Sequence, residues 1–199
     1  MSKGDQTRRR IVEKTGGLFN RFGYRATPMS AVMRVTGLKK GGLYNHFRSK
    51  KELALATFRF NVSTVSTFLD GAAAGAADPV GQLRLLLAAS LGIAAGDVVP
   101  GGCPVLNAAV ESDDAFPALR REVVVGAENL RGKISTLLRR ARDSGRARRD
   151  TDPENLSVFF LASIEGGIML SKLHGASLPL KTVLESLNRM IDSIEIGAE

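Results

Sequence analysis

The stretch TPMSAVMRVTGLKKGGLYNHFRSK, residues 27–50, decides the fold. It predicts a helix over 29–35, with Thr27 as N-cap and Pro28 at the first helical position, where the missing N–H of proline costs nothing. This helix stops at Gly37, and a second helix follows after a short turn and runs to about Phe47. Two helices joined by a turn of about three residues that contains glycine are typical of a helix-turn-helix.

The second helix of this pair separates into an apolar and a polar face. Leu43 and Phe47 lie one turn apart and are predicted to point inward. The other residues suit the major groove of DNA, because Asn pairs with adenine through two hydrogen bonds, Lys reaches guanine or phosphate, and Gly permits a close approach. Taken singly, Tyr44 also fits a partly buried aromatic residue and His46 an ordinary surface histidine. The predicted DNA-contacting residues on and beside this helix are Lys39, Lys40, Gly41, Gly42, Tyr44, Asn45 and His46.

Positive charge is concentrated around this stretch. The chain of 199 residues has a formal net charge of +8. Residues 1–50 contain 12 Lys and Arg against only Asp5 and Glu13, whereas the rest of the chain has a slight excess of acids. Such a local excess attracts polyanions. Charge alone leaves a solvated basic surface, DNA, RNA and an anionic membrane as alternatives, and the residue pattern of 27–50 favours duplex DNA.

The whole chain predicts an all-α fold of about nine helices, because no segment alternates apolar and polar residues as strands do. A first helix is expected over about 7–22 with Asp5 as N-cap, although Gly16 and Gly17 inside it should each cost about 1 kcal/mol relative to Ala. Its expected apolar face consists of Ile11, Leu18, Phe19 and Phe22. Further helices are expected over 51–69 (capped by Ser49), 80–95, 104–111, 117–144, 153–174 and 179–194.

The sequence lacks features that several classes of protein require. Cys103 is the only cysteine, and His46 and His174 lie far apart, so neither a disulfide nor a metal site is expected. The most apolar stretches, such as 83–95, fall short of the roughly 18 residues that span a bilayer, and residues 1–10 have no apolar core of a signal peptide. The glycines of 37–42 are not followed by the Lys-Ser/Thr of a phosphate loop, and no nucleophile elbow is present. We therefore expect a cytoplasmic protein that is not an enzyme, with no catalytic residues, no cofactor and no membrane partner.

The run TPM…TGLKKGGLYNHFRSKKEL, together with the preceding LF…FGY…AT, resembles the signature of the tetracycline-repressor (TetR) family over about residues 7–55. The resemblance implies an all-helical homodimer with a three-helix DNA-binding domain (1–50) and a larger domain for effector binding and dimerisation (51–199). By position, it implies that Lys40, Gly41, Tyr44, Asn45 and His46 face DNA and that Thr27 and Lys50 hold phosphates. The pair Gly16-Gly17 and Met33 depart from the family pattern, which puts the helix packing in question.

The rest of the chain supplies candidates for an effector pocket. The segment GGCPVLN, residues 101–107, resembles one that lies near the effector pocket in many family members. Cys103 suits a thiol that senses oxidants or electrophiles, or a small buried side chain. Asn107 suits a contact to a ligand or to its own loop, and apolar residues at helical spacing are usually core. The candidate pocket residues are Phe58, Phe68, Leu87, Leu91, Cys103, Asn107 and Met169.

The last two helices are expected to form the dimer interface. The stretch LASIEGGIML, residues 161–170, is strongly apolar and has small residues at its centre, which allow two helices to approach closely. The alternative is that both helices belong to the core of one subunit. The predicted interface residues are Phe160, Ile164, Gly167, Ile168, Leu187, Met190, Ile191 and Ile194.

Three functions are compatible with these features. The first is a homodimeric repressor that binds a palindromic DNA site and is released by a small apolar or aromatic effector. The second keeps the DNA binding but places the trigger at an oxidised or alkylated Cys103. The third belongs to another class, a helical small-molecule-binding protein or enzyme with an incidental basic N-terminus, and the clustered charge argues against it.

Overall fold

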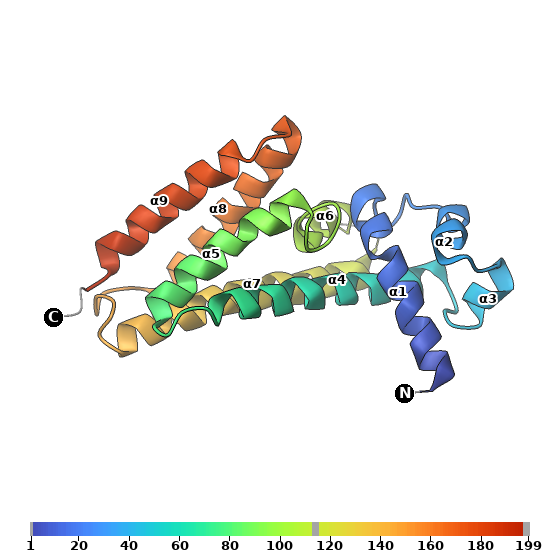
Figure 1. The fold of residues 1–199 in the computed structure, drawn as a ribbon, viewed down its shortest axis with the longest axis horizontal. Coiled ribbons are helices and arrows are strands. Elements are labelled where there is room, and N and C mark those ends of the chain that lie inside the picture. Colours follow the sequence, from blue (N-terminus) through green and yellow to red (C-terminus); the bar gives the residue numbers. More distant parts are fainter. Residues whose placement is uncertain (1, 113–115, 197–199) are drawn as a thin grey trace. The chain divides into compact units, whose positions relative to one another are not determined.

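The computed structural model describes residues 2–112 and 116–196, which form helices and a single isolated antiparallel bridge between Ala147 and Glu195 (Figure 1). The all-α class and the order of the helices are as predicted. The nine helices of these residues are α1 (Lys3–Phe22), α2 (Met29–Thr36), α3 (Lys40–Tyr44), α4 (Lys50–Ala73), α5 (Pro79–Ala95), α6 (Pro104–Glu111), α7 (Pro117–Asp143), α8 (Pro153–His174) and α9 (Leu178–Ile194).

Several helix ends differ from the prediction, and α4 continues to Ala73, past its predicted end at residue 69. The N-cap of α1 is Ser2, whose hydroxyl accepts from the N–H of Asp5 while the Asp5 carboxylate accepts from the N–H of Ser2, so the helix starts four residues before the predicted Thr7. This reciprocal pair is a capping box, and it makes Asp5 the third helical residue. The N-cap of α2 is Pro28 and not Thr27, and α3 ends at Tyr44.

The described residues divide into two compact units, and the first contains residues 1–65 and 96–125. Its core includes an aromatic cluster in which the ring of Tyr24 stacks on Phe19 and meets Phe58 edge-on, with 5.7 Å between ring centroids in both pairs. The buried face of α1 consists of Ile11, Val12, Thr15, Gly16, Phe19 and Asn20. Phe22, at the end of the helix, is 63% exposed, so its predicted inward orientation is wrong.

Steric constraints explain why two glycines lie in the middle of α1. A Cβ atom on Gly16 would lie 2.6 Å from Oδ1 of Asn61 on α4, and one on Gly17 would lie 2.9 Å from Cβ of Pro100. The Asn61 amide donates a hydrogen bond to the Gly16 carbonyl oxygen over 3.1 Å. Residues of low helix propensity therefore occupy the middle of α1, because two other segments approach its backbone too closely for a side chain.

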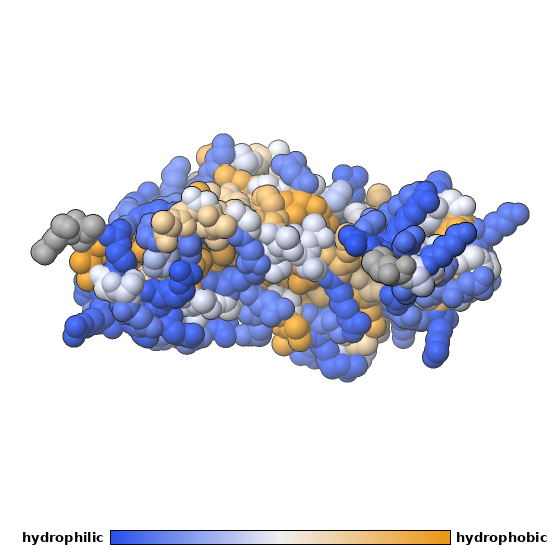
Figure 2. Space-filling view, turned by 60° about the horizontal axis from the view of Figure 1, so that its bottom comes forward, coloured by the Kyte–Doolittle hydropathy of each residue, from blue (hydrophilic) through white to orange (hydrophobic). Residues whose placement is uncertain are grey.

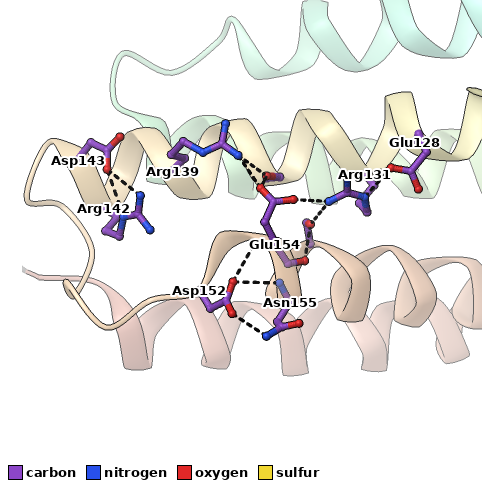
Figure 3. A network of polar contacts seen from close by, with 10 residues as sticks. Glu128, Arg131, Arg139, Arg142, Asp143, Asp152, Glu154 and Asn155 are labelled. Atoms are coloured by element: carbon purple, nitrogen blue, oxygen red, sulfur yellow. Dashed lines mark hydrogen bonds and ion pairs between the residues drawn. The ribbon is translucent and has the colours of Figure 1, made fainter.

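The second unit contains residues 66–95 and 126–199, of which the structure describes those up to 196. Here α8 and α9 pack against each other as a helical hairpin, and both contact α5. Ser171 on α8 accepts a hydrogen bond from the N–H of Leu180 on α9 at the closed end of the hairpin. At its other end, the hairpin is tied to α7 by Glu154, which accepts hydrogen bonds from Arg131, Ser135 and Arg139 (Figure 3).

The helix α8 is apolar on two opposite faces. One face, which includes Phe160, Ile164 and Ile168, is buried within the subunit. The other face includes Phe159 and Leu173, whose side chains remain exposed. By length and composition α8 is long and apolar enough to cross a membrane, which corrects the expectation that every apolar stretch is too short, although a core helix passes the same test. A helix that is apolar all round needs a covering partner on each face.

Candidate DNA interface and effector site

The segment α2–turn–α3 has the geometry of a helix-turn-helix. The helix α2 ends at Gly37, which has a φ of +73° and donates its N–H to the carbonyl oxygen of Met33 over 2.9 Å. A left-handed conformation of this kind favours glycine and reverses the chain direction within a few residues. The helix α3 then starts at Lys40, and hydrogen-bonded turns continue from its end to Phe47.

The polar and apolar faces of α3 lie as the sequence predicts. Leu43 and Phe47 are almost completely buried, and Tyr44 on the opposite side is 40% exposed. Outside the backbone of α3 itself, no atom of the described residues lies within 4 Å of a Cβ placed on Gly41, so another molecule has room to approach there. In Figure 2 the surface of the N-terminal helices is largely hydrophilic. Lys39, Lys40, Gly41, Tyr44 and Asn45 are exposed, and Gly42 and His46 are half-buried.

The junction between α3 and α4 is held by a carboxylate that was not among the predicted site residues. Glu52 accepts hydrogen bonds from the backbone N–H of Arg48 and from the guanidinium of Arg8 on α1, over 2.8 and 3.0 Å. The hydroxyl of Ser49 accepts from the N–H of Glu52, which confirms Ser49 as the cap of α4. The hydrogen bonds from Arg48 and Arg8 lower the pKa of the Glu52 carboxyl. The spacing Ser49-x-x-Glu52 is a capping-box pattern, and this signal was available in the sequence.

The two predicted phosphate contacts occupy different environments. Thr27 is fully buried, its hydroxyl donates to the Gly23 carbonyl oxygen over 2.6 Å, and its N–H donates to the same oxygen. Thr27 thus has no free donor in this structure, and its assignment as a phosphate contact is corrected. Lys50 is half-buried and donates through Nζ to the carbonyl oxygen of Arg25. Burial lowers the pKa of Lys50, and the Glu111 carboxylate opposes this shift.

A polar network within the first unit joins α1 to the start of α6. The amide of Asn20 on α1 donates to the carbonyl oxygens of Gly102 and Pro100, over 2.8 and 3.2 Å. The amide of Asn107 on α6 donates to the Asn20 side chain over 3.1 Å and to the carbonyl oxygen of Gly101 over 2.9 Å. These contacts support the interpretation of Asn107 as a residue that orders its own loop.

The seven candidate effector residues are divided between the two units. Phe58, Cys103 and Asn107 belong to the first unit, whereas Phe68, Leu87, Leu91 and Met169 belong to the second. Phe58 and Leu87 are core residues, and Met169 is exposed on α8. Cys103 is only 2% exposed, which favours the small buried side chain over the accessible thiol sensor.

A cavity of small-molecule size lies elsewhere among the described residues of the second unit. It is an open groove of about 650 Å³ between the end of α4, the start of α5 and the middle of α7, and none of the seven candidates lines it. A smaller cleft of about 200 Å³ in the first unit is lined by Tyr24, Arg25, Lys50, Lys51 and Phe116. Among the residues that the structure describes, no three His, Cys, Asp or Glu side chains are grouped to hold a metal ion.

The predicted dimer-interface residues lie mostly inside the subunit. Phe160, Ile164, Gly167, Ile168, Leu187 and Ile191 are buried, and Met190 and Ile194 are half-buried. The reason is visible at Gly167, where a Cβ would lie 2.9 Å from Cδ1 of Leu180. The small residue of α8 thus allows α9 of the same chain to approach. The apolar side chains left exposed on α8 are Val158, Phe159, Met169, Leu170 and Leu173.

Comparisons with known proteins agree with this architecture. The model of a family described as "Tetracyclin repressor-like, C-terminal domain" matches residues 79–187, and that of "Bacterial regulatory proteins, tetR family" matches residues 11–57. The HTH-type transcriptional repressor DhaR of Mycobacterium sp. (strain GP1) is 28% identical over 181 residues, which are 89% of this chain and 88% of that protein.

Solved structures show the same fold over the whole chain. A TetR transcriptional regulator from Chloroflexus aurantiacus J-10-FL is 35% identical, with a TM-score of 0.93 and coverage of 99% of this chain and 100% of the other. The regulator CifR, solved as a cysteine mutant with 26-bp double-strand operator DNA, is 19% identical, with a TM-score of 0.80 over 94% of this chain and 95% of its own. With matches to both family models and a full-length relative at 35% identity, the chain belongs to the TetR family of DNA-binding transcriptional regulators, which are not enzymes.

Proposed function

We propose that the protein is a cytoplasmic, homodimeric repressor that binds a palindromic operator and is released by a small molecule. The observation that carries this proposal is the pair of faces on α3, with Leu43 and Phe47 buried and Tyr44 exposed beside the open backbone of Gly41. In a dimer, each subunit places its α3 in a major groove, and the two half-sites lie about one helical turn or slightly more apart. The operator complex of the similarly folded CifR supports this mode of binding.

The exposed residues of α3 are assigned to two kinds of contact. Asn45 and Tyr44 suit base edges, because an amide pairs with adenine and an aromatic ring contacts the thymine methyl group. Lys39 and Lys40 suit phosphates or guanine, and His46 and Gly42 lie at the margin of the same surface. Lys50 remains a candidate phosphate contact if its Nζ exchanges the Arg25 carbonyl oxygen for a phosphate oxygen. We place the boundary of the DNA-binding domain at about residue 50.

The dimer interface is proposed on the exposed apolar face of α8. Phe159, Met169, Leu170 and Leu173 follow one stripe of this helix, on the side opposite its buried face. Gly166 lies in the same stripe, and a Cβ placed on it would have nothing within 4 Å, so a second helix has room to pack there. A second copy related by a twofold axis covers both stripes at once.

A DNA-binding measurement with matched variants tests the proposal. Fluorescence anisotropy on the DNA upstream of the gene should show tight, salt-dependent binding by the full chain. Asn45→Ala should weaken specific binding by about 1–3 kcal/mol, and Lys40→Ala should also reduce the slope of log affinity against log salt by about 1. The control is Lys181→Ala, an exposed lysine on α9, which should leave both quantities unchanged. Unaltered DNA binding by the Lys40 and Asn45 variants would refute the assignment of α3 as the recognition helix.

A further inference from the structure

The groove between α4, α5 and α7 is lined by both charged and apolar residues. Leu86 and Leu137, which belong to its lining, are almost completely buried, and outside the α7 backbone itself no described atom lies within 4 Å of a Cβ placed on Gly132. Its volume of about 650 Å³ falls within the range of small-molecule sites, roughly 300–1,000 Å³. The groove therefore offers space, apolar surface and charged groups together.

The part of the groove lining that belongs to α7 contains two basic side chains. Lys133 and Arg140 are seven residues apart, so they lie on the same side of the helix and about 10 Å apart along it. The side chain of Lys133 is only 19% exposed, and its ammonium forms an ion pair with Asp70 on α4. Arg140 donates one hydrogen bond, to the amide oxygen of Gln82 on α5 over 2.9 Å.

The acids of the lining are already neutralised by other side chains. Asp70 is paired with Lys133, and Glu128 is paired with Arg131, whose guanidinium lies 2.8 Å from it. Within the described part of the chain, the hydrogen-bond partner of the Arg140 guanidinium is thus an uncharged amide. A guanidinium has five N–H donors in a planar fork that matches a carboxylate, so Arg140 keeps donors for a second acceptor.

We propose that this groove binds a small organic anion, with its carboxylate on Arg140 and its apolar body over Leu86 and Leu137. That this anion acts as the effector of the regulator rests on the proposed function. That the groove binds the anion does not depend on it. The charged group of this ligand class was not part of the small apolar or aromatic effector that the sequence predicts. The difference arises because this groove is lined by charged residues of α4 and α7 and by none of the seven candidate pocket residues.

Binding of 2-naphthoate to the full-length protein tests the proposal, with uncharged 2-naphthamide as the matched probe. Isothermal titration calorimetry should detect naphthoate, and the amide should bind at least ten times more weakly, because a charge-assisted hydrogen bond contributes more than a neutral one. Arg140→Gln should lower the naphthoate affinity at least tenfold. Arg120→Gln, an exposed arginine of the same helix, should not change it.

A second variant fills the groove without altering its charge. Gly132→Leu places a side chain into the open space, in a helix interior where leucine is favoured over glycine, so the fold should be retained and naphthoate binding lost. Circular dichroism establishes that the variant is folded. The proposal is overturned if wild-type protein fails to bind naphthoate, or if Arg140→Gln or the folded Gly132→Leu variant binds it as well as wild type does.

Anisotropy on the upstream DNA separates this inference from the proposed function. Naphthoate binding without salt-dependent DNA affinity refutes the repressor and leaves the anion site. DNA affinity without naphthoate binding refutes the anion site and leaves the repressor. Release of the DNA by bound naphthoate supports both, and bound naphthoate that leaves the DNA affinity unchanged refutes the role of the groove as the effector site.

Discussion

At the scale of single residues, the two glycines in the middle of α1 are explained by what approaches them. Gly16 lies against Asn61, and Gly17 lies against Pro100. Neither neighbour is the flexible end of a long side chain, since Asn61 is buried and bonded to the Gly16 carbonyl oxygen. The absence of a Cβ at these positions is thus a condition for the packing of the first unit.

Replacement of Gly16 by alanine should therefore destabilise the protein, although alanine is the better helix former. The added Cβ would lie 2.6 Å from Oδ1 of Asn61, and overpacking of this kind typically costs about 1–3 kcal/mol. Gly71→Ala is the control, because that position has nothing within 4 Å in α4 and should gain about 0.5–1 kcal/mol. Urea denaturation followed by circular dichroism measures both changes, and an increase in the stability of Gly16→Ala would contradict the steric explanation.

The residues on α3 could be predicted from sequence because each depends on a local pattern. Leu43 and Phe47 are one helical turn apart, and their inward orientation follows from the period of the helix. Thr27 could not be placed in this way. Its burial depends on the path of the chain between α1 and α2, where its hydroxyl turns back to the Gly23 carbonyl oxygen. Gly23 itself, with a φ of +89°, is the C-cap that ends α1, and the hydrogen bond from Thr27 to it is a contact between residues of different turns.

At the scale of helices, α7 and α8 are joined by one carboxylate at the first turn of α8. Glu154 accepts hydrogen bonds over 2.5 Å from the hydroxyl of Ser135 and from the guanidinium groups of Arg131 and Arg139 (Figure 3). Asp152 caps the same turn by accepting from the N–H groups of Glu154 and Asn155. The hydrogen bonds from Ser135, Arg131 and Arg139 lower the pKa of the Glu154 carboxyl to about 2.

This lowered pKa predicts a stability difference that depends on pH. The Glu154 pKa is lower in the folded than in the unfolded chain, so ionised Glu154 stabilises the fold above pH 4.5, and this contribution is lost as the pH falls towards 2. The loss of thermal stability caused by Glu154→Gln should thus be larger at pH 7 than at pH 3. Glu185→Gln, on the exposed side of α9, is the control and should show a smaller pH-dependent difference. Equal losses for Glu154→Gln at the two pH values would contradict a role for the ionised carboxylate.

The helix boundaries of the second unit could be predicted closely, whereas the faces of α8 could not. Proline and glycine mark the ends of this helix at Pro153 and Gly175. Apolar residues cover both of its faces, so the sequence pattern does not decide which face meets α9 and which is left outside. The close approach of Leu180 to Gly167 decides it, and this contact depends on tertiary packing.

At the scale of the whole molecule, the outer face of α8 leaves large apolar side chains in water. Leu173 is 74% exposed, and Phe159, Met169 and Leu170 extend the same stripe over almost four turns of the helix. Contiguous apolar surface of this kind usually marks an interaction site. The proposed dimer would cover this surface.

Charges on this face should dissociate the dimer. The double change Leu170→Glu and Leu173→Glu places two carboxylates where they would face their copies in the partner, and like charges held close together in an interface are strongly unfavourable. Light scattering at micromolar concentration should give a monomer, with a folded far-UV spectrum. The control Ser186→Glu, on the exposed side of α9, should remain dimeric. A dimer that survives the double change would place the interface elsewhere.

The close packing of α1 against Asn61 and Pro100 also limits how the operator specificity of one regulator can be transferred to another. A hybrid joined after residue 50 would separate Gly16 from Asn61, and Asn20 from the carbonyl oxygens of Pro100 and Gly102. The DNA-binding domain of another regulator would then have to pack against Asn61 and Pro100. These two residues leave no space for side chains at the positions of Gly16 and Gly17. Operator specificity is therefore better changed by substituting the exposed residues of α3 than by replacing the first 50 residues with those of another regulator.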